Sequence, residues 1–221
     1  MLASPWTLPH YAMGDNYDLS YAFPSAPYAG GINGYVRTSG ITGGIPGAER
    51  ASDGRILLGH STAFRVATEG TWVDSNMQRF GLSALLSGNH RWEIGTDWSF
   101  YQENADGIID RQWIGTINAS FVFAQSEHAQ FRTGVGVRMM PTNLDNQMGI
   151  NLLYGMDFYP TDPLILSIRG DVGNVGDAFA AEARASAGIV IGALEFYGGY
   201  HKMWIGDQAF GGPTVGLRVW N

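Results

Sequence analysis

The chain has 221 residues, of which 15% are charged, with 31 glycines, no cysteine and a formal net charge of −7. The lack of cysteine excludes disulfides, thiolate metal sites and cysteine nucleophiles. An acidic chain without a basic run argues against nucleic acid as a partner. The charged fraction is low for a soluble domain, where about 25% is typical. We predict no cofactor and no metal site.

Residues 1–57 differ in composition from the rest of the chain, because they are rich in glycine, proline, serine and tyrosine. This composition predicts an irregular N-terminal extension. We expect it to dock in the lumen or at the rim of a barrel formed by residues 58–221, or otherwise against another chain. The segment Met1–Trp6 lacks the basic start and apolar core of a signal peptide, so we assume that a signal peptide has already been removed.

From Thr62 onward, apolar and polar side chains alternate, most clearly between Phe179 and Lys202. Successive side chains of a strand point to opposite faces, so this period predicts β-strands. No window of 18 apolar residues predicts a transmembrane helix, whereas 9–11 residues suffice for a tilted membrane strand. Ten strands are predicted: Thr62–Trp72, Met77–Leu86, Arg91–Tyr101, Gln112–Ala124, Ala129–Met139, Met148–Tyr159, Leu164–Asp171, Phe179–Ile191, Leu194–Lys202 and Thr214–Trp220.

The predicted connections alternate between short turns and longer loops, which indicates an up-and-down barrel of the outer-membrane kind. An even number of strands places both termini at the short-turn, periplasmic end. The predicted longer loops are Gln102–Arg111, Met140–Gln147, Val172–Ala178 and Met203–Pro213.

In the predicted strands, the charged residues occupy alternate positions, so their side chains lie on one face of the sheet. Twelve of the thirteen basic residues are arginines, which suit ion pairs away from bulk water because the guanidinium holds a carboxylate with two donors. We predict an ion-pair network in the lumen, made by Arg65, Glu69, Arg79, Glu93, Asp97, Arg132, Arg138, Asp157, Arg169, Asp171, Glu182, Arg184, Glu195 and Arg218.

The side chains on the opposite face of the predicted sheet are apolar. Aromatic residues lie near the strand ends of this face, as in the interfacial girdles of membrane proteins. The predicted girdle comprises Trp72, Trp92, Phe100, Trp113, Phe123, Phe158 and Trp220.

These two faces resemble those of bacterial outer-membrane β-barrel proteins, especially the small ones with eight to ten strands. The strand Leu217–Trp220, which ends in an aromatic residue, is similar to their C-terminal assembly signal. The resemblance implies an all-β, closed, antiparallel transmembrane barrel in the outer membrane of Gram-negative bacteria, with lipid around it. It carries no activity by itself.

Four functions remain open from the sequence. The first is a non-enzymatic structural component, whose extension or long loops bind another envelope protein or a like subunit. The second is a narrow, porin-like passive pore plugged by the extension, although ten strands enclose little more than their own side chains. The third is a surface hydrolase at the rim. The fourth is a soluble barrel with its apolar face inward, around an apolar ligand.

Two groups of polar residues are weaker site candidates. His201 and Asp171 are expected near the outer rim, with Asp177 and Asp207 in adjacent loops, where a hydrolase would need them. Glu103, Asp106 and Asp110 share one loop and could bind calcium, although their spacing fits no EF-hand. His60, beside Ser61, forms no recognisable dyad or triad.

Overall fold

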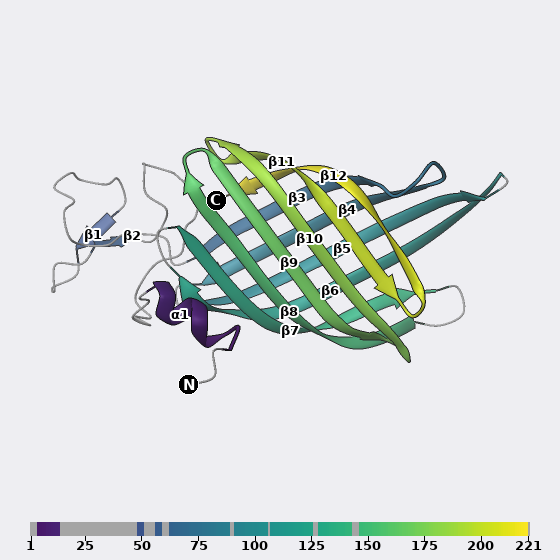
Figure 1. The fold of residues 1–221 in the computed structure, drawn as a ribbon, viewed down its shortest axis with the longest axis horizontal. Coiled ribbons are helices and arrows are strands. Elements are labelled where there is room, and N and C mark those ends of the chain that lie inside the picture. Colours follow the sequence, from purple (N-terminus) through teal and green to yellow (C-terminus); the bar gives the residue numbers. More distant parts are fainter. Residues whose placement is uncertain are drawn as a thin grey trace.

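A computed structural model describes residues 4–13, 48–50, 56–58, 62–88, 91–105, 107–125, 128–142 and 146–220. The dominant feature is a closed antiparallel barrel of ten strands (Figure 1). Its strands are β3 (Thr62–Trp72), β4 (Met77–Gly88), β5 (Trp92–Ala105), β6 (Ile108–Gln125), β7 (Ala129–Pro141), β8 (Asn146–Thr161), β9 (Leu164–Val175), β10 (Ala178–Ile191), β11 (Leu194–Ile205) and β12 (Gln208–Trp220).

Each barrel strand pairs with its neighbour in the sequence, and β12 pairs with β3 to close the wall. This order is the predicted up-and-down topology with ten strands, and the prediction is confirmed. Because β12 pairs with β3 over Thr214–Trp220, the first and last barrel strands are not open sheet edges there. The described helix is too short and too polar to be a membrane span.

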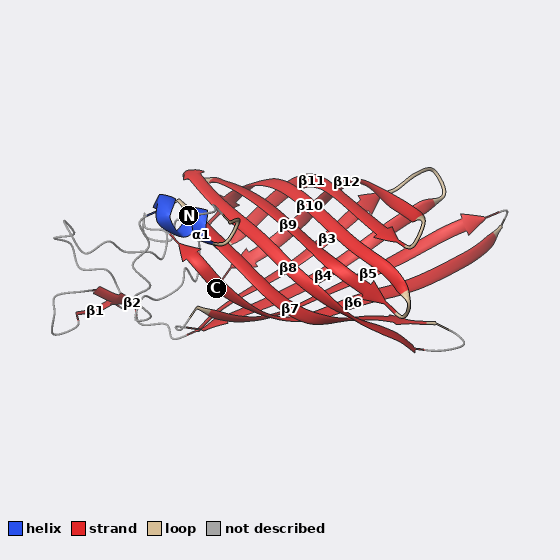
Figure 2. Cartoon of the chain, turned by 60° about the horizontal axis from the view of Figure 1, so that its bottom comes forward, coloured by secondary structure: helices blue, strands red, loops and turns tan. Residues whose placement is uncertain are grey.

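The predicted long loops are wrong, because most of their residues extend the strands. The β5–β6 hairpin, for example, continues to Ala105 paired with Ile108, and it projects beyond its neighbours at the end opposite α1 (Figure 1 and Figure 2). The turns that remain are tight: Gly176 and Gly206 each adopt a φ of +54°, followed by an aspartate. Glycine-led two-residue turns suit the twist of a hairpin, so pairing continues to the tip.

The side chains of the barrel strands alternate as the sequence predicts, with polar groups inside and apolar groups outside. In β5, Glu93 and Asp97 are buried in the lumen, whereas Ile94 between them is 62% exposed on the outer wall. The interior is therefore the charged face. This is the reverse of the arrangement that a soluble barrel around an apolar ligand would need.

Two short strands, β1 (Ala48–Arg50) and β2 (Ile56–Leu58), pair with each other outside the barrel sheet. The helix α1 (Thr7–Met13) lies against the outer wall, where it contacts β6. The indole Nε1 of Trp6 donates to Thr133 Oγ1 at 3.3 Å, and the Tyr154 hydroxyl donates to the Pro5 carbonyl at 2.9 Å.

Residues 4–13 thus contact the outside of the barrel wall, and none of the α1 side chains is buried. The prediction that the extension docks in the lumen, at the rim or against another chain stays a prediction. Apart from residues 4–13 and the two short strands, the extension lies outside the described residues.

Candidate functional site

The candidate site is the barrel lumen, where every one of the fourteen predicted charged residues forms an ion pair. These ion pairs form separate groups at different heights in the lumen. Inward-pointing residues of neighbouring strands bring these side chains together, because residues of like parity share one face of a sheet.

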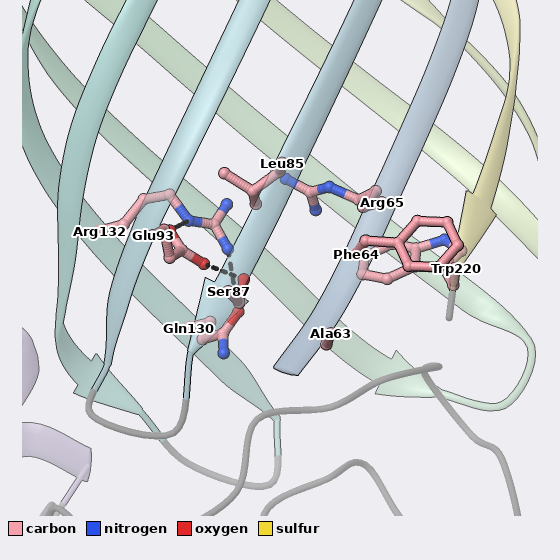
Figure 3. Close-up of a pocket in the computed structure, with 9 residues that line it drawn as sticks. All are labelled: Ala63, Phe64, Arg65, Leu85, Ser87, Glu93, Gln130, Arg132 and Trp220. Atoms are coloured by element: carbon pink, nitrogen blue, oxygen red, sulfur yellow. Dashed lines mark hydrogen bonds and ion pairs between the residues drawn. The ribbon is translucent and has the colours of Figure 1, made fainter. Parts of the chain in front are cut away.

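The first group lies near the end of the barrel where β3 begins, and Asp157 of β8 is its centre. Its Oδ2 accepts from Arg65 Nη1 at 2.9 Å and from Arg132 Nη1 at 2.7 Å, and its Oδ1 accepts from the Ser167 hydroxyl at 2.7 Å. Arg132 also donates to Glu93 at 2.9 Å. Figure 3 shows Arg132 and Glu93 meeting inside the barrel, with Arg65 at the same level.

The second group occupies the middle of the lumen around Arg184 of β10. Its guanidinium lies 3.0 Å from Asp97 and 3.5 Å from Glu69. Glu69 also pairs with Arg79 at 2.6 Å, and Asp97 pairs with Arg169 at 2.5 Å. Five strands are thus cross-linked through shared carboxylates, since these residues come from β3, β4, β5, β9 and β10.

The third group joins β11 to β12. Arg218 Nη1 donates to both oxygens of Glu195, at 3.0 and 2.9 Å, and the indole Nε1 of Trp220 donates to the same carboxylate at 2.8 Å. The guanidinium carbon of Arg218 stands 4.6 Å from the ring centroid of Tyr197, whose hydroxyl donates to Glu69 at 3.0 Å. Tyr197 therefore connects the third group with the second.

Two further pairs lie toward the hairpin-tip end, and one corrects the rim hypothesis. His201 is fully buried, not at the rim, and its Nε2 lies 2.9 Å from Glu182 Oε1. Asp171 pairs with Arg138 of β7 and not with His201. The predicted rim position is wrong because β11 runs on to Ile205, which places His201 well below the strand end.

A cluster of buried apolar residues lies toward each end of the lumen. At the hairpin-tip end, the buried residues Tyr101, Ile114 and Met203 form a cluster, against which four partly buried residues pack. Those four are Met77, Met140, Ile205 and Phe210. At the opposite end, the buried cluster comprises Tyr159, Ile165, Val190 and Trp220.

A cavity of about 70 Å³ remains among the central charged groups, lined by Arg184, Arg218 and Asp157 with their neighbours. Such a volume holds a few water molecules, because one water occupies about 30 Å³ of liquid. A second void, of about 20 Å³, lies beside Ser87 and Glu93 (Figure 3). Ten strands thus leave an interior that side chains nearly fill.

Glycines on the inward face make room for the long side chains. A Cβ at Gly188 would lie 2.2 Å from Glu195 Oε1, and a Cβ at Gly216 would lie 2.4 Å from Tyr197 Cζ. Both distances are too short for real contacts. The lumen glycines therefore have a packing role at these positions.

Sequence reasoning missed several uncharged members of the site. Tyr197 and Trp220 hydrogen-bond lumen carboxylates, as do the hydroxyls of Ser87, Ser120 and Ser167. The signal was present for four of them, because Tyr197, Trp220, Ser87 and Ser167 lie an even number of residues from a charged lumen residue of their own strand. Trp220 lies two residues after Arg218, so the same face follows from strand period.

Of the predicted girdle, Trp72, Trp92 and Trp113 are half or more exposed on the outer wall, and Phe100 and Phe158 are partly exposed there. Trp220 is a correction, since its indole binds Glu195 in the lumen. Phe123 lies within the register shift between Val122 and Ala124 and is buried beside the rings of Phe131 and Tyr154. An interfacial role for the outward residues stays a prediction.

The calcium-loop hypothesis is only partly covered by the structure. Glu103 and Asp110 are exposed and face each other across the β5–β6 hairpin. Asp106, like His60, lies outside the described residues. Within the described ranges, no three acidic or histidine side chains converge as a metal site would need.

No protein-family model matches the chain, and the comparison with curated proteins found no significant similarity. The site's own chemistry therefore carries the functional argument. In the described lumen, carboxylates are bound by arginines and histidine is bound by a carboxylate, an arrangement that fills and cross-links the barrel.

Proposed function

We propose that the chain is a closed, non-conducting β-barrel of the bacterial outer membrane, which serves as a structural anchor. The main support is a lumen in which charged side chains are paired and only a small cavity remains, with a cluster of buried apolar residues toward each end. The outer wall supports the membrane location, because large apolar side chains cover it on all sides of the barrel. Examples are Phe80, Ile94, Ile117, Val135, Ile150, Ile168, Ile189, Phe196 and Leu217.

The direction of insertion follows from hairpin length. Outer-membrane barrels have short periplasmic turns and longer extracellular hairpins. The β5–β6 hairpin projects at the end opposite α1 (Figure 2), so we place that end outside the cell. The start of β3 and the end of β12 are then periplasmic.

The anchored element in this proposal is the N-terminal extension. Residues 4–13 are fastened to the outer wall by Trp6 and Tyr154, and Leu8 and Tyr11 of α1 are 59% and 69% exposed. An apolar helix face with aromatic residues is typical of the membrane interface. The extension would thus be held at the periplasmic surface, where another envelope protein or a second copy can bind it.

Fractionation and conductance measurements test the proposal. The full chain is expected in the outer membrane, soluble only with detergent, and with a gel mobility that changes on boiling. In planar bilayers it should give no steady current, with a sixteen-stranded porin reconstituted in parallel as the positive control. Steady conductance would refute the sealed lumen and favour the pore. Recovery in solution without detergent would refute the membrane location.

A further inference from the structure

The outer wall carries a groove of about 730 Å³ over β8 to β11 beside Trp6. This wall faces the reader in Figure 1, with α1 near its end. Most of the groove surface is apolar. Its lining includes Lys202 and also the strand positions Arg169, Asp171, Glu182 and Arg184, whose charged groups take part in the lumen ion pairs. Lys202 is also the only lysine of the chain.

Strand register explains how the groove forms. Thr133, Tyr154, Gly170, Ala183 and Lys202 are successive cross-strand partners from β7 to β11. Gly170 and Ala183 lie at the centre of this row. Because their side chains are absent or small, they leave the outer surface of the sheet low at this point. The neighbouring outward rows form the banks of the groove, with Leu152 and Val172 on one side and Ile168, Ala185 and Tyr200 on the other.

The length of the groove suits a lipid chain. The row from Thr133 to Lys202 crosses four strand spacings, which is about 19 Å at roughly 4.8 Å per spacing. One leaflet of a bilayer has an apolar thickness of about 15 Å, half of the 30 Å core. Since the row is inclined to the barrel axis by the tilt of the strands, an acyl chain in the groove would cross about one leaflet.

The positive charge of Lys202 at one end of the groove favours a lipid with an anionic head group. Among the outward side chains of β8 to β11, Lys202 is the only charged one, and no carboxylate of the described chain pairs with it. Its Nζ lies 5.9 Å from the ring centroid of Trp204, which is two residues nearer the β11–β12 turn. A lysine beside tryptophan near a strand end is typical of the membrane interface, where the ammonium reaches the head groups.

We propose that this groove binds a lipid with an anionic phosphate head group from the leaflet at the hairpin-tip end, with its phosphate at Lys202 and an acyl chain extending toward Trp6. A second copy of the chain fits less well. The outward residues of β8 to β11 offer no carboxylate, so a symmetric dimer through this wall would bury both ammonium groups without a partner.

This inference rests on the proposed membrane location, and the experiment separates the two. The detergent-solubilised full chain is mixed with phosphatidylglycerol or with phosphatidylcholine of identical acyl chains, and retained lipid is counted by native mass spectrometry. The wild type is expected to retain the acidic lipid about fivefold better, the preference that one interfacial lysine gives. Lys202→Gln should abolish this preference, and Lys202→Arg should keep it.

The groove itself is tested by filling it. A Cβ at Gly170 meets only the Glu182 carbonyl, at 3.6 Å, so Gly170→Leu is compatible with the backbone. We expect this variant to retain less of both lipids. Gly70→Leu is the matched control, because Gly70 faces outward on β3 with nothing within 4 Å of its Cβ position.

Three results would overturn the proposal: equal retention of the two lipids by the wild type, equal retention by the Gly170 and Gly70 variants, or a dimer that Gly170→Leu dissociates. The last would make the groove a protein interface. A protein that requires detergent and shifts on boiling, yet does not discriminate the lipids, would refute only this inference. A protein that is soluble without detergent would refute the membrane location as well.

Discussion

The sharpest test of the lumen network is the removal of Asp157, the carboxylate shared by Arg65 and Arg132. Asp157 has a side-chain exposure of 3%, and Arg65 has no other ion-pair partner in the described chain. Arg132 keeps Glu93. Breaking a buried pair by deleting one partner costs about 3–5 kcal/mol. We expect Asp157→Ala to lower the free energy of unfolding by about that amount, a large share of the roughly 5–15 kcal/mol of a typical protein.

Urea titration of the folded protein in detergent, followed by tryptophan fluorescence and by the gel shift, measures this loss. With a slope of about 2 kcal/mol per M, the midpoint should fall by roughly 1.5–2.5 M. Asp177→Ala, in the exposed β9–β10 turn, is the control and should change stability by less than about 0.5 kcal/mol. Adding Arg65→Met to Asp157→Ala should restore part of the loss, because the unpaired charge is gone. Equal midpoints for the Asp157 and Asp177 variants would refute the reasoning.

Three further variants test other contacts by the same titration or by proteolysis. Trp220→Phe keeps a ring in the lumen but loses a 2.8 Å hydrogen bond to a carboxylate, and should cost about 1.5–3 kcal/mol; an unchanged midpoint would contradict the inward assignment. Gly216→Ala forces a Cβ against Tyr197 and should cost about 1–3 kcal/mol, whereas Gly198→Ala on the outer wall, 3.8 Å from its nearest neighbour, should cost less. Trp6→Ala should leave the barrel midpoint within about 0.5 kcal/mol while chymotrypsin cleaves the N-terminal segment faster, and equal cleavage rates would argue against docking of α1.

The proposed sealing of the lumen also bears on the role of the extension. A plug is needed only where a barrel leaves an opening, and in the described lumen the paired charges and the two apolar clusters leave little space. In the proposed anchor, the extension would therefore serve as a binding element. This argument depends on barrel size, because eight to ten strands enclose little more than side chains whereas sixteen leave a channel.

Local alternation of polar and apolar residues is enough to predict most of the fold. Strand period alone separates Arg184 and Glu182 from the alanines between them, so the charged face and the number of strands follow from the sequence. The position of Trp220 also follows from this period, since it shares the parity of Arg218. The prediction that Trp220 belongs to the girdle rests on its place near the end of the last strand. The alternation of side chains along that strand predicts its inward position correctly.

Other features depend on contacts that a single strand does not encode. How far each hairpin extends depends on pairing between strands. Residues that were predicted as loops therefore belong to strands, and His201 lies within β11, paired on both sides. The burial of Phe123 depends on its ring contacts with Phe131 of β7 and Tyr154 of β8. The division of the charges into groups around Asp157, Arg184 and Glu195 depends on the tilt and stagger of the closed wall.

Side-chain period is a property of the strand alone, so the amino-acid sequence is enough to predict a barrel of alternating strands with one charged and one apolar face. The closed wall is needed to show which carboxylate each arginine binds, that α1 lies outside the wall, and that Gly170 and Ala183 open a groove that ends at Lys202. These features arise between residues that are neighbours only after the wall closes. Strand register, which sets those neighbours, is a property of the whole barrel.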